Sequence, residues 1–146
     1  MSFSLIRACR SCGRKNRVQA KHLADGEGVR CGVCKSPLPP VDEPIEVDAE
    51  SFEAIVREAP VPVLVDFWAE WCAPCRAAAP QVHDLAREMA GRAVVLKVDT
   101  EAHPALAERF GVKSIPNFVV LKNGAVALQR AGLAPRDEMR RWLEAA

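Results

Sequence analysis

Apolar positions follow two periods along residues 45–146, and they predict strands that alternate with helices. Short apolar runs typical of buried strands occur at 45–47, 61–68, 93–98, 118–121 and 125–128. Helical spacing predicts helices from Asp48 or Ser51 to about 58, then at 72–89, 104–110 and 135–143. The last two strands flank Asn123-Gly124, a typical hairpin turn. The order βαβαβαββα predicts an α/β fold with a mixed central sheet flanked by helices.

The first 35 residues lack both periods and contain almost no large apolar side chains after Ile6. A segment this small cannot bury enough apolar surface to fold unaided. Four prolines follow within residues 36–44, which predicts a stiff, extended connector. We therefore expect three parts, namely a small module at 1–36, a linker at 37–44 and a larger domain at 45–146.

Charge separates the same two regions. Residues 1–35 carry eight Lys or Arg side chains against two acids, although the whole chain has a net charge of only +1. No apolar run is long enough for a secretory signal or a membrane span. We therefore expect a cytoplasmic protein without a membrane partner. In a reducing compartment, its six cysteines are expected to be metal ligands or catalytic thiols.

Two Cys-x-x-Cys pairs lie in the N-terminal module, Cys9 with Cys12 and Cys31 with Cys34. This spacing predicts one tetrahedral zinc ion held by four thiolates, as in a zinc ribbon. Zinc binding would stabilise a segment that has no core of its own. Gly13 and Gly32 are expected to permit the tight turns. Two disulfides or an iron–sulfur cluster are the alternatives.

A third pair, Cys72 and Cys75, stands where a buried strand passes into a helix. A helix N-terminus favours an anion, so Cys72 is predicted to react as a thiolate. Cys75, one turn further on, is predicted to resolve the mixed disulfide that Cys72 forms. Asp66 lies in the preceding apolar strand, where burial raises the pKa of a carboxyl and suits it to exchange a proton with Cys75. The alternative interpretation of the pair is two further metal ligands or inert thiols.

These residues carry a resemblance to a known family. The matching motifs are Val-Asp-Phe-Trp-Ala-Glu-Trp-Cys-Ala-Pro-Cys at 65–75, Pro80, Ser-Ile-Pro at 114–116 and Lys-Asn-Gly at 122–124. In this order and spacing they resemble a thioredoxin, over residues 45–146. Ala73 departs from the family, in which glycine is usual. The N-terminal cysteines extend the resemblance to the zinc-containing branch of bacterial thioredoxins.

The resemblance implies a thioredoxin fold and further site residues. Lys97 is similar to the lysine beside the buried acid, and Pro116 after Ile115 is similar to the cis-proline that faces the dithiol. Trp71 and Gly132 resemble the rest of the surface that contacts substrate. The implied partners are a thioredoxin reductase and disulfide-containing client proteins.

We therefore expect a thiol–disulfide oxidoreductase that reduces client disulfides through Cys72 and Cys75, with a structural zinc and a redox-active disulfide. A nucleic-acid adaptor is a second hypothesis, because zinc ribbons with basic faces bind phosphate backbones. We expect no nucleic-acid partner, since no aromatic side chains are interleaved with the basic ones to stack on bases. A disulfide-forming oxidase or isomerase is a third hypothesis, which compartment and reduction potential decide.

Overall fold

The computed structural model describes residues 4–24 and 29–146. Five strands form one sheet in the order β3-β5-β4-β6-β7. The strands are β3 (Ile45–Glu46), β4 (Val63–Trp68), β5 (Val94–Asp99), β6 (Asn117–Lys122) and β7 (Ala125–Ala131). β3, β5 and β4 are parallel, while β6 and β7 run antiparallel to their neighbours. The predicted mixed sheet and the predicted order of elements are both confirmed.

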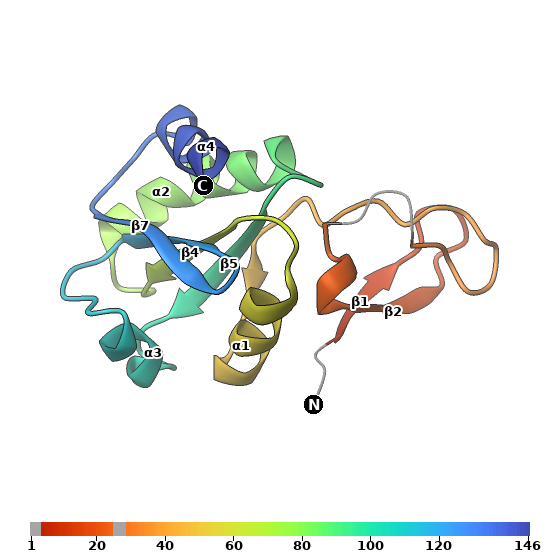
Figure 1. The fold of residues 1–146 in the computed structure, drawn as a ribbon, viewed down its shortest axis with the longest axis horizontal. Helices are drawn as coiled ribbons and strands as arrows, with labels where there is room; N and C mark the ends of the chain where they lie inside the picture. The colour runs from red at the N-terminus through yellow and green to blue at the C-terminus, as the bar shows by residue number, and fades with distance from the viewer. Residues whose placement is uncertain (1–3, 25–28) are drawn as a thin grey trace.

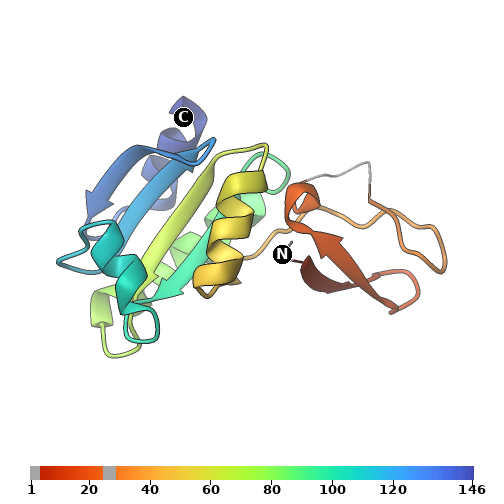
Figure 2. The ribbon, with the colours of Figure 1, turned by 60° about the horizontal axis from the view of Figure 1, so that its bottom comes forward.

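Two helices cover each face of this sheet (Figures 1 and 2). The helices are α1 (Ala49–Glu58), α2 (Ala73–Glu88), α3 (Pro104–Arg109) and α4 (Arg136–Ala145). One apolar cluster joins α1 and α3 to the sheet, and a second joins α2 and α4 to the opposite face. The sheet is therefore buried on both sides, as expected for nearly continuous apolar strands.

Local chemistry explains where α1 begins. Asp48 is the N-cap residue, and its carboxylate accepts a hydrogen bond of 2.8 Å from the Ser51 N–H. The Ser51 hydroxyl in turn accepts from the Asp48 N–H at 3.0 Å, so two backbone donors of the first turn are satisfied. Pro80 lies inside α2, which continues as one helix from Ala73 to Glu88.

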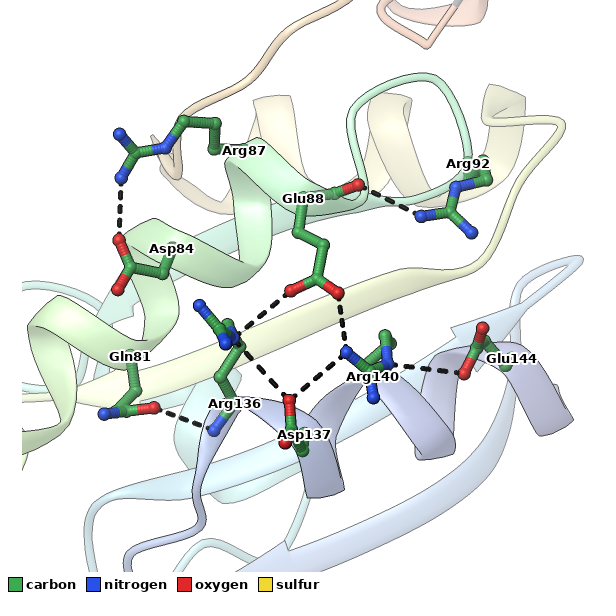
Figure 3. A network of polar contacts seen from close by, with 9 residues as sticks. All are labelled: Gln81, Asp84, Arg87, Glu88, Arg92, Arg136, Asp137, Arg140 and Glu144. Atoms are coloured by element: carbon green, nitrogen blue, oxygen red, sulfur yellow. Dashed lines mark hydrogen bonds and ion pairs between the residues drawn. The ribbon is translucent and has the colours of Figure 1, made fainter.

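A charged network joins α2 to α4 on the outer surface (Figure 3). Glu88 of α2 pairs with Arg140 at 2.6 Å and with Arg136 at 3.2 Å. Gln81, two turns earlier on α2, accepts a hydrogen bond of 2.9 Å from the Arg136 N–H. These contacts fix the start of α4 against α2.

The N-terminal module contains strands that the periodicity of residues 1–35 does not predict. β1 (Ser4–Ala8) and β2 (Lys15–Gln19) form an antiparallel pair, followed by the short 3-10 helix η1 (Ala20–His22). Two of the partly buried positions in these strands are polar, Arg7 and Asn16, so the strands show no alternation of apolar and polar residues. Arg7 donates to the Pro39 carbonyl at 2.6 Å, and Asn16 accepts from the Gly32 N–H. The apolar pattern of residues 1–35 therefore did not reveal these two strands.

The module packs against the larger domain beside α1 (Figure 1). Leu23 is 1% exposed and belongs to the same apolar cluster as α1. Its carbonyl accepts a hydrogen bond of 2.8 Å from the Val41 N–H. Leu38 and Val41 are themselves buried, so the proline-rich segment is more than a solvated connector.

No helix in residues 4–24 and 29–146 is both long enough and apolar enough to cross a membrane.

Candidate active site

Cys72 and Cys75 stand at the junction between β4 and α2. Cys72 is the N-cap residue of α2, and its Sγ accepts a hydrogen bond of 3.2 Å from the Cys75 N–H. The two residues form a disulfide, with their Cα atoms 5.2 Å apart. Both are almost fully buried, at 3% and 4% exposure. A cysteine pair held at a helix N-terminus, within bonding distance, has the geometry of a redox-active dithiol.

A loop between α3 and β6 faces the dithiol. The Ile115–Pro116 peptide bond is cis, and the Ile115 carbonyl oxygen lies 3.7 Å from Cys72 Sγ. The Gly132 N–H donates to the Pro116 carbonyl at 2.8 Å, which ties the end of β7 to this loop. The structure thus brings together three residues that the resemblance assigned to one surface.

Trp71 forms the exposed part of this surface. Its side chain is 67% exposed, and its indole N–H donates a 2.8 Å hydrogen bond to Glu101. Beside it lies an open hollow of about 270 Å³, lined by Trp71, Thr100, Ala107, Val112, Lys113, Ser114 and Ile115. The sequence reasoning did not identify Glu101 or this hollow, because no local pattern links residues 100–101 to Trp71.

Asp66 lies in the middle of β4 and is 2% exposed. Its Oδ1 atom has no hydrogen-bond partner among the described residues. Burial raises the pKa of Asp66 to about 7, although the nearby Lys97 acts in the opposite direction. A carboxyl group with this pKa can both take up and release a proton near neutral pH.

Lys97 is the partner of Asp66 in the register of β4 and β5. It is half-buried, with its ammonium 4.4 Å from the centre of the Trp68 ring. The structure therefore places a cation beside the buried acid, as the resemblance implied. Glu46, which sequence reasoning did not single out, is the partner of Lys97 on β3.

The four N-terminal cysteines form a second cluster. Their Sγ atoms all lie within 4.8 Å of one another, with Cys9 and Cys34 at 3.6 Å and Cys12 and Cys31 at 3.7 Å. Four thiolates at about 2.3 Å from a tetrahedral zinc ion lie about 3.8 Å apart, so the cluster fits that ion. The four cysteines are free, unlike the pair at 72 and 75.

The chain turns in the same way after each of the two Cys-x-x-Cys pairs. The residue after the second cysteine of each pair has a positive φ, 79° at Gly13 and 64° at Lys35. Gly32 lies in the second turn, as expected, but the left-handed conformation falls at Lys35 and not at Gly32. Its N–H instead donates to Asn16, which links the second cysteine pair to β2. Lysine at 35 occupies the position where the first pair has glycine.

Backbone donors also reach the sulfur atoms of this cluster. The Val33 N–H lies 3.4 Å from Cys31 Sγ. Hydrogen bonds from the Cys34 and Val33 backbone lower the pKa of the Cys31 thiol to about 6. Such donors favour the thiolate, which is the form that binds zinc.

Comparisons with known proteins agree with this geometry. The family model described as thioredoxin matches residues 43–145. Thioredoxin C-3 of Corynebacterium nephridii is 38% identical over 140 residues, covering 96% of this chain and 94% of that protein. Thioredoxin of Haemophilus influenzae is 34% identical over 103 residues, covering 70% of this chain and 96% of that protein.

A solved structure, that of thioredoxin f from spinach chloroplast, superimposes with a TM-score of 0.66. It is 32% identical and the match covers 72% of this chain and 87% of that one.

Proposed function

The chain belongs to the thioredoxin family of protein-disulfide reductases, and from that premise we propose which residue performs each step of its thiol–disulfide exchange. Cys72 is the attacking thiol and Cys75 the resolving one. The observation that carries this assignment is the hydrogen bond from the Cys75 N–H to Cys72 Sγ, which places Cys72 at the helix N-terminus. Helix N–H groups stabilise the anionic form of the sulfur that attacks.

The exchange proceeds in two displacements. The Cys72 thiolate attacks one sulfur of a client disulfide, forms a mixed disulfide and expels a client thiolate. Cys75 then loses its proton, and its thiolate attacks Cys72 Sγ. The mixed disulfide breaks, the Cys72–Cys75 disulfide forms and the second client thiolate leaves. Two electrons pass from the dithiol to the client, so the client is reduced and this protein is oxidised.

Asp66 accepts the proton of Cys75 in the second displacement. Its burial and its pKa of about 7 suit a base that must also give the proton back. Lys97 acts on Asp66 rather than on the sulfur, because it is the register partner of that acid. It favours the ionised carboxylate once the proton has left.

Clients dock on the surface formed by Trp71, Ile115, Pro116 and Gly132. The Ile115 carbonyl, 3.7 Å from Cys72 Sγ, is available to pair with the backbone of an extended client segment. The exposed Trp71 ring supplies apolar contact next to the attacked disulfide. A thioredoxin reductase, which would use the same surface, is the proposed source of electrons.

The N-terminal cluster binds one structural zinc ion through Cys9, Cys12, Cys31 and Cys34, which makes this chain a member of the zinc-containing thioredoxin branch. The sulfur separations support this, and the alignment with thioredoxin C-3 extends into the N-terminal segment because it covers 96% of the chain. The zinc ion would supply folding free energy and take no part in the exchange.

We also propose the division into a zinc module at 1–36, a linker at 37–44 and a reductase domain at 45–146. The family match, which begins at residue 43, supports the second boundary. Four free cysteines fit a reducing compartment, and we propose the cytoplasm.

Reduction of insulin disulfides with dithiothreitol as electron source tests the two thiol roles. We expect Cys72→Ser to lower the rate at least about a thousandfold, because it removes the nucleophile. Reduced Cys75→Ser, mixed with insulin after the dithiothreitol has been removed, should instead accumulate a mixed disulfide with the client, visible on a non-reducing gel. Trapping of clients by Cys72→Ser and not by Cys75→Ser would reverse the assignment. Zinc content should stay at one ion per chain in both variants.

A further inference from the structure

Three ionisable side chains form a row across adjacent strands behind the dithiol. Glu46 on β3 is the register partner of Lys97 on β5, and Lys97 is the register partner of Asp66 on β4. Register partners on neighbouring strands point to the same face of a sheet. The row therefore runs on one face in the order carboxylate, ammonium, carboxylate.

Exposure falls along this row toward the dithiol. Glu46 stands exposed on the edge strand, Lys97 is half-buried and Asp66 is 2% exposed. Among the described residues, no carboxylate oxygen lies within ion-pair distance of Lys97, whose ammonium rests over the Trp68 ring. Lys97 thus forms a direct ion pair with neither Glu46 nor Asp66, and its charge can act on both carboxylates.

Few other charged groups of the described residues face this row. On the β6 side, the register partner of Asp66 is Phe118, which is fully buried and apolar. Of the residues that α2 buries, only Cys75 is titratable, and only in the reduced protein. Asp99 and His103 act on Glu46, at the exposed end of the row. The charges that bear on Asp66 are therefore those of Lys97 and Glu46.

We propose that Glu46 is a positioning residue for proton transfer at Asp66: it shares Lys97 with the buried acid, so that the acid keeps its affinity for the Cys75 proton at neutral pH. This inference rests on the proposed role of Asp66. Glu46 touches neither the client nor the sulfur atoms, and it acts through the charge that it places at the edge of the sheet.

The effects of the neighbouring charges on the pKa of Asp66 have the signs that this proposal requires. Burial raises the pKa of Asp66, Lys97 lowers it, and the Glu46 carboxylate raises it further. Neighbouring strands lie about 4.8 Å apart, so the two acids flank Lys97 at a Cα separation of roughly 10 Å. When Glu46 is neutralised, a like charge disappears and Lys97 is left to Asp66 alone. Both changes favour the ionised form of Asp66.

Glu46→Gln tests the proposal in the reduced full-length protein. The Asp66 carboxyl carbon is followed by NMR from pH 4 to pH 9. We expect its pKa to fall by about half a pH unit relative to the unmodified chain. Glu43→Gln, which neutralises an exposed acid three residues earlier, is the matched control and should leave the Asp66 pKa unchanged. Glu46→Asp, which keeps the charge, should restore most of the original value.

Lys97→Gln should shift the pKa of Asp66 in the opposite direction to Glu46→Gln. It should raise the pKa of Asp66, and Glu46→Gln should then have a smaller effect in that background than in the unmodified chain. An Asp66 pKa that does not move in Glu46→Gln would overturn the proposal, as would an equal fall in Glu43→Gln.

Activity separates this inference from the function on which it rests. The acidic limb of the rate–pH profile should move to lower pH in Glu46→Gln, in step with the NMR titration. If Asp66→Asn reduced insulin as fast as the unmodified chain, the role of Asp66 would fail. The NMR titration would still show whether Glu46 sets the proton affinity of that acid.

Discussion

The two cysteine sites of this chain are held in place by different means. Cys72 caps α2 and Cys75 lies in its first turn. This helix and the preceding strand β4 are fixed by a large core that includes Phe52, Phe67 and Phe118, each fully buried. The N-terminal module has no comparable core, and the large apolar side chains that it buries within its described strands and η1 are few. Its sulfur cluster lies where tight turns meet, and the proposed zinc ion would join these turns through the four sulfur atoms.

This difference separates the sites chemically as well. The dithiol can gain and lose a disulfide because its supporting elements do not depend on that bond. The proposed zinc ion would cross-link the module, so its cysteines could not leave the metal without loss of structure.

The dithiol and the linker lie at opposite ends of the parallel strands. Cys72 follows the carboxyl end of β4, whereas Pro40 of the linker lies near Gly91, which precedes the parallel strand β5. Changes at one site should therefore leave the other intact.

Metal removal should produce the largest effect. Structural zinc contributes on the order of 10 kcal/mol of folding free energy in small modules of this kind. A strong chelator, or Cys12→Ser, should therefore abolish amide protection in β1 and β2 while β4 and β5 stay protected. Hydrogen exchange followed by NMR, with zinc content measured in parallel, checks this. Insulin reduction should change less than about twofold.

Cys72→Ser is the reciprocal control, since it should keep both zinc and module protection. Full protection of β1 and β2 in a metal-free sample would contradict the dependence of the module on its cross-link.

Asp66→Asn should give the next largest effect, with opposite signs for activity and stability. Loss of the base should slow insulin reduction by about a hundredfold. The folded pKa of about 7 lies above the usual value of 3.8, so the contribution of Asp66 to stability should be greatest below pH 4 and fall as the pH rises through 7. Asparagine removes this dependence and should stabilise the protein at pH 8 by on the order of 3 kcal/mol.

Urea unfolding at pH 4, 6 and 8 measures this effect. The difference between the two proteins should be small at pH 4 and reach its maximum above pH 7. If Asp66→Asn and the unmodified chain were equally stable at pH 8, ionisation of the buried carboxyl would not destabilise the fold.

The sequence predicted the reductase domain well because its pattern is strong. Five strands and four helices were expected in their observed order, and Asp48 was one of the two caps expected for α1. The module was harder, since its strands turn the polar residues Arg7 and Asn16 inward and satisfy them by hydrogen bonds. Side-chain polarity alone cannot reveal such partners, which lie far along the chain.

Some residues of the candidate site were likewise predictable from sequence, and others were not. The positions of Cys72, Cys75 and Asp66 followed from motif and strand pattern. The sequence analysis did not identify Glu46 or Glu101. The contact of Glu46 depends on strand register, and that of Glu101 on the packing of a loop. Neither feature produces a recognisable pattern in the nearby sequence. At the second cysteine turn the left-handed residue is Lys35 and not Gly32, which the sequence pattern did not reveal.

Leu23→Ala should have an effect confined to the contact between the two regions. Leu23 is 1% exposed and packs in the cluster that includes α1, so truncation should cost about 2–4 kcal/mol. The loss should appear as reduced amide protection in η1 and at Val41, measured by hydrogen exchange, with zinc still bound.

Val33→Ala is the matched control, because Val33 is apolar but 63% exposed. It should leave protection unchanged. If both variants behaved alike, apolar docking at Leu23 would not be what holds the module to the domain.

Arg10→Gln should have the smallest effect, although Arg10 also joins the module to the linker. Its pair with Asp42 spans 3.3 Å, but the two side chains are 67% and 36% exposed. An exposed ion pair contributes about 0–1 kcal/mol and weakens with salt. Urea unfolding should therefore detect a change below about 0.5 kcal/mol, absent at about 1 M salt. A loss as large as that of Leu23→Ala would mean that charge, not apolar burial, attaches the module to the reductase domain.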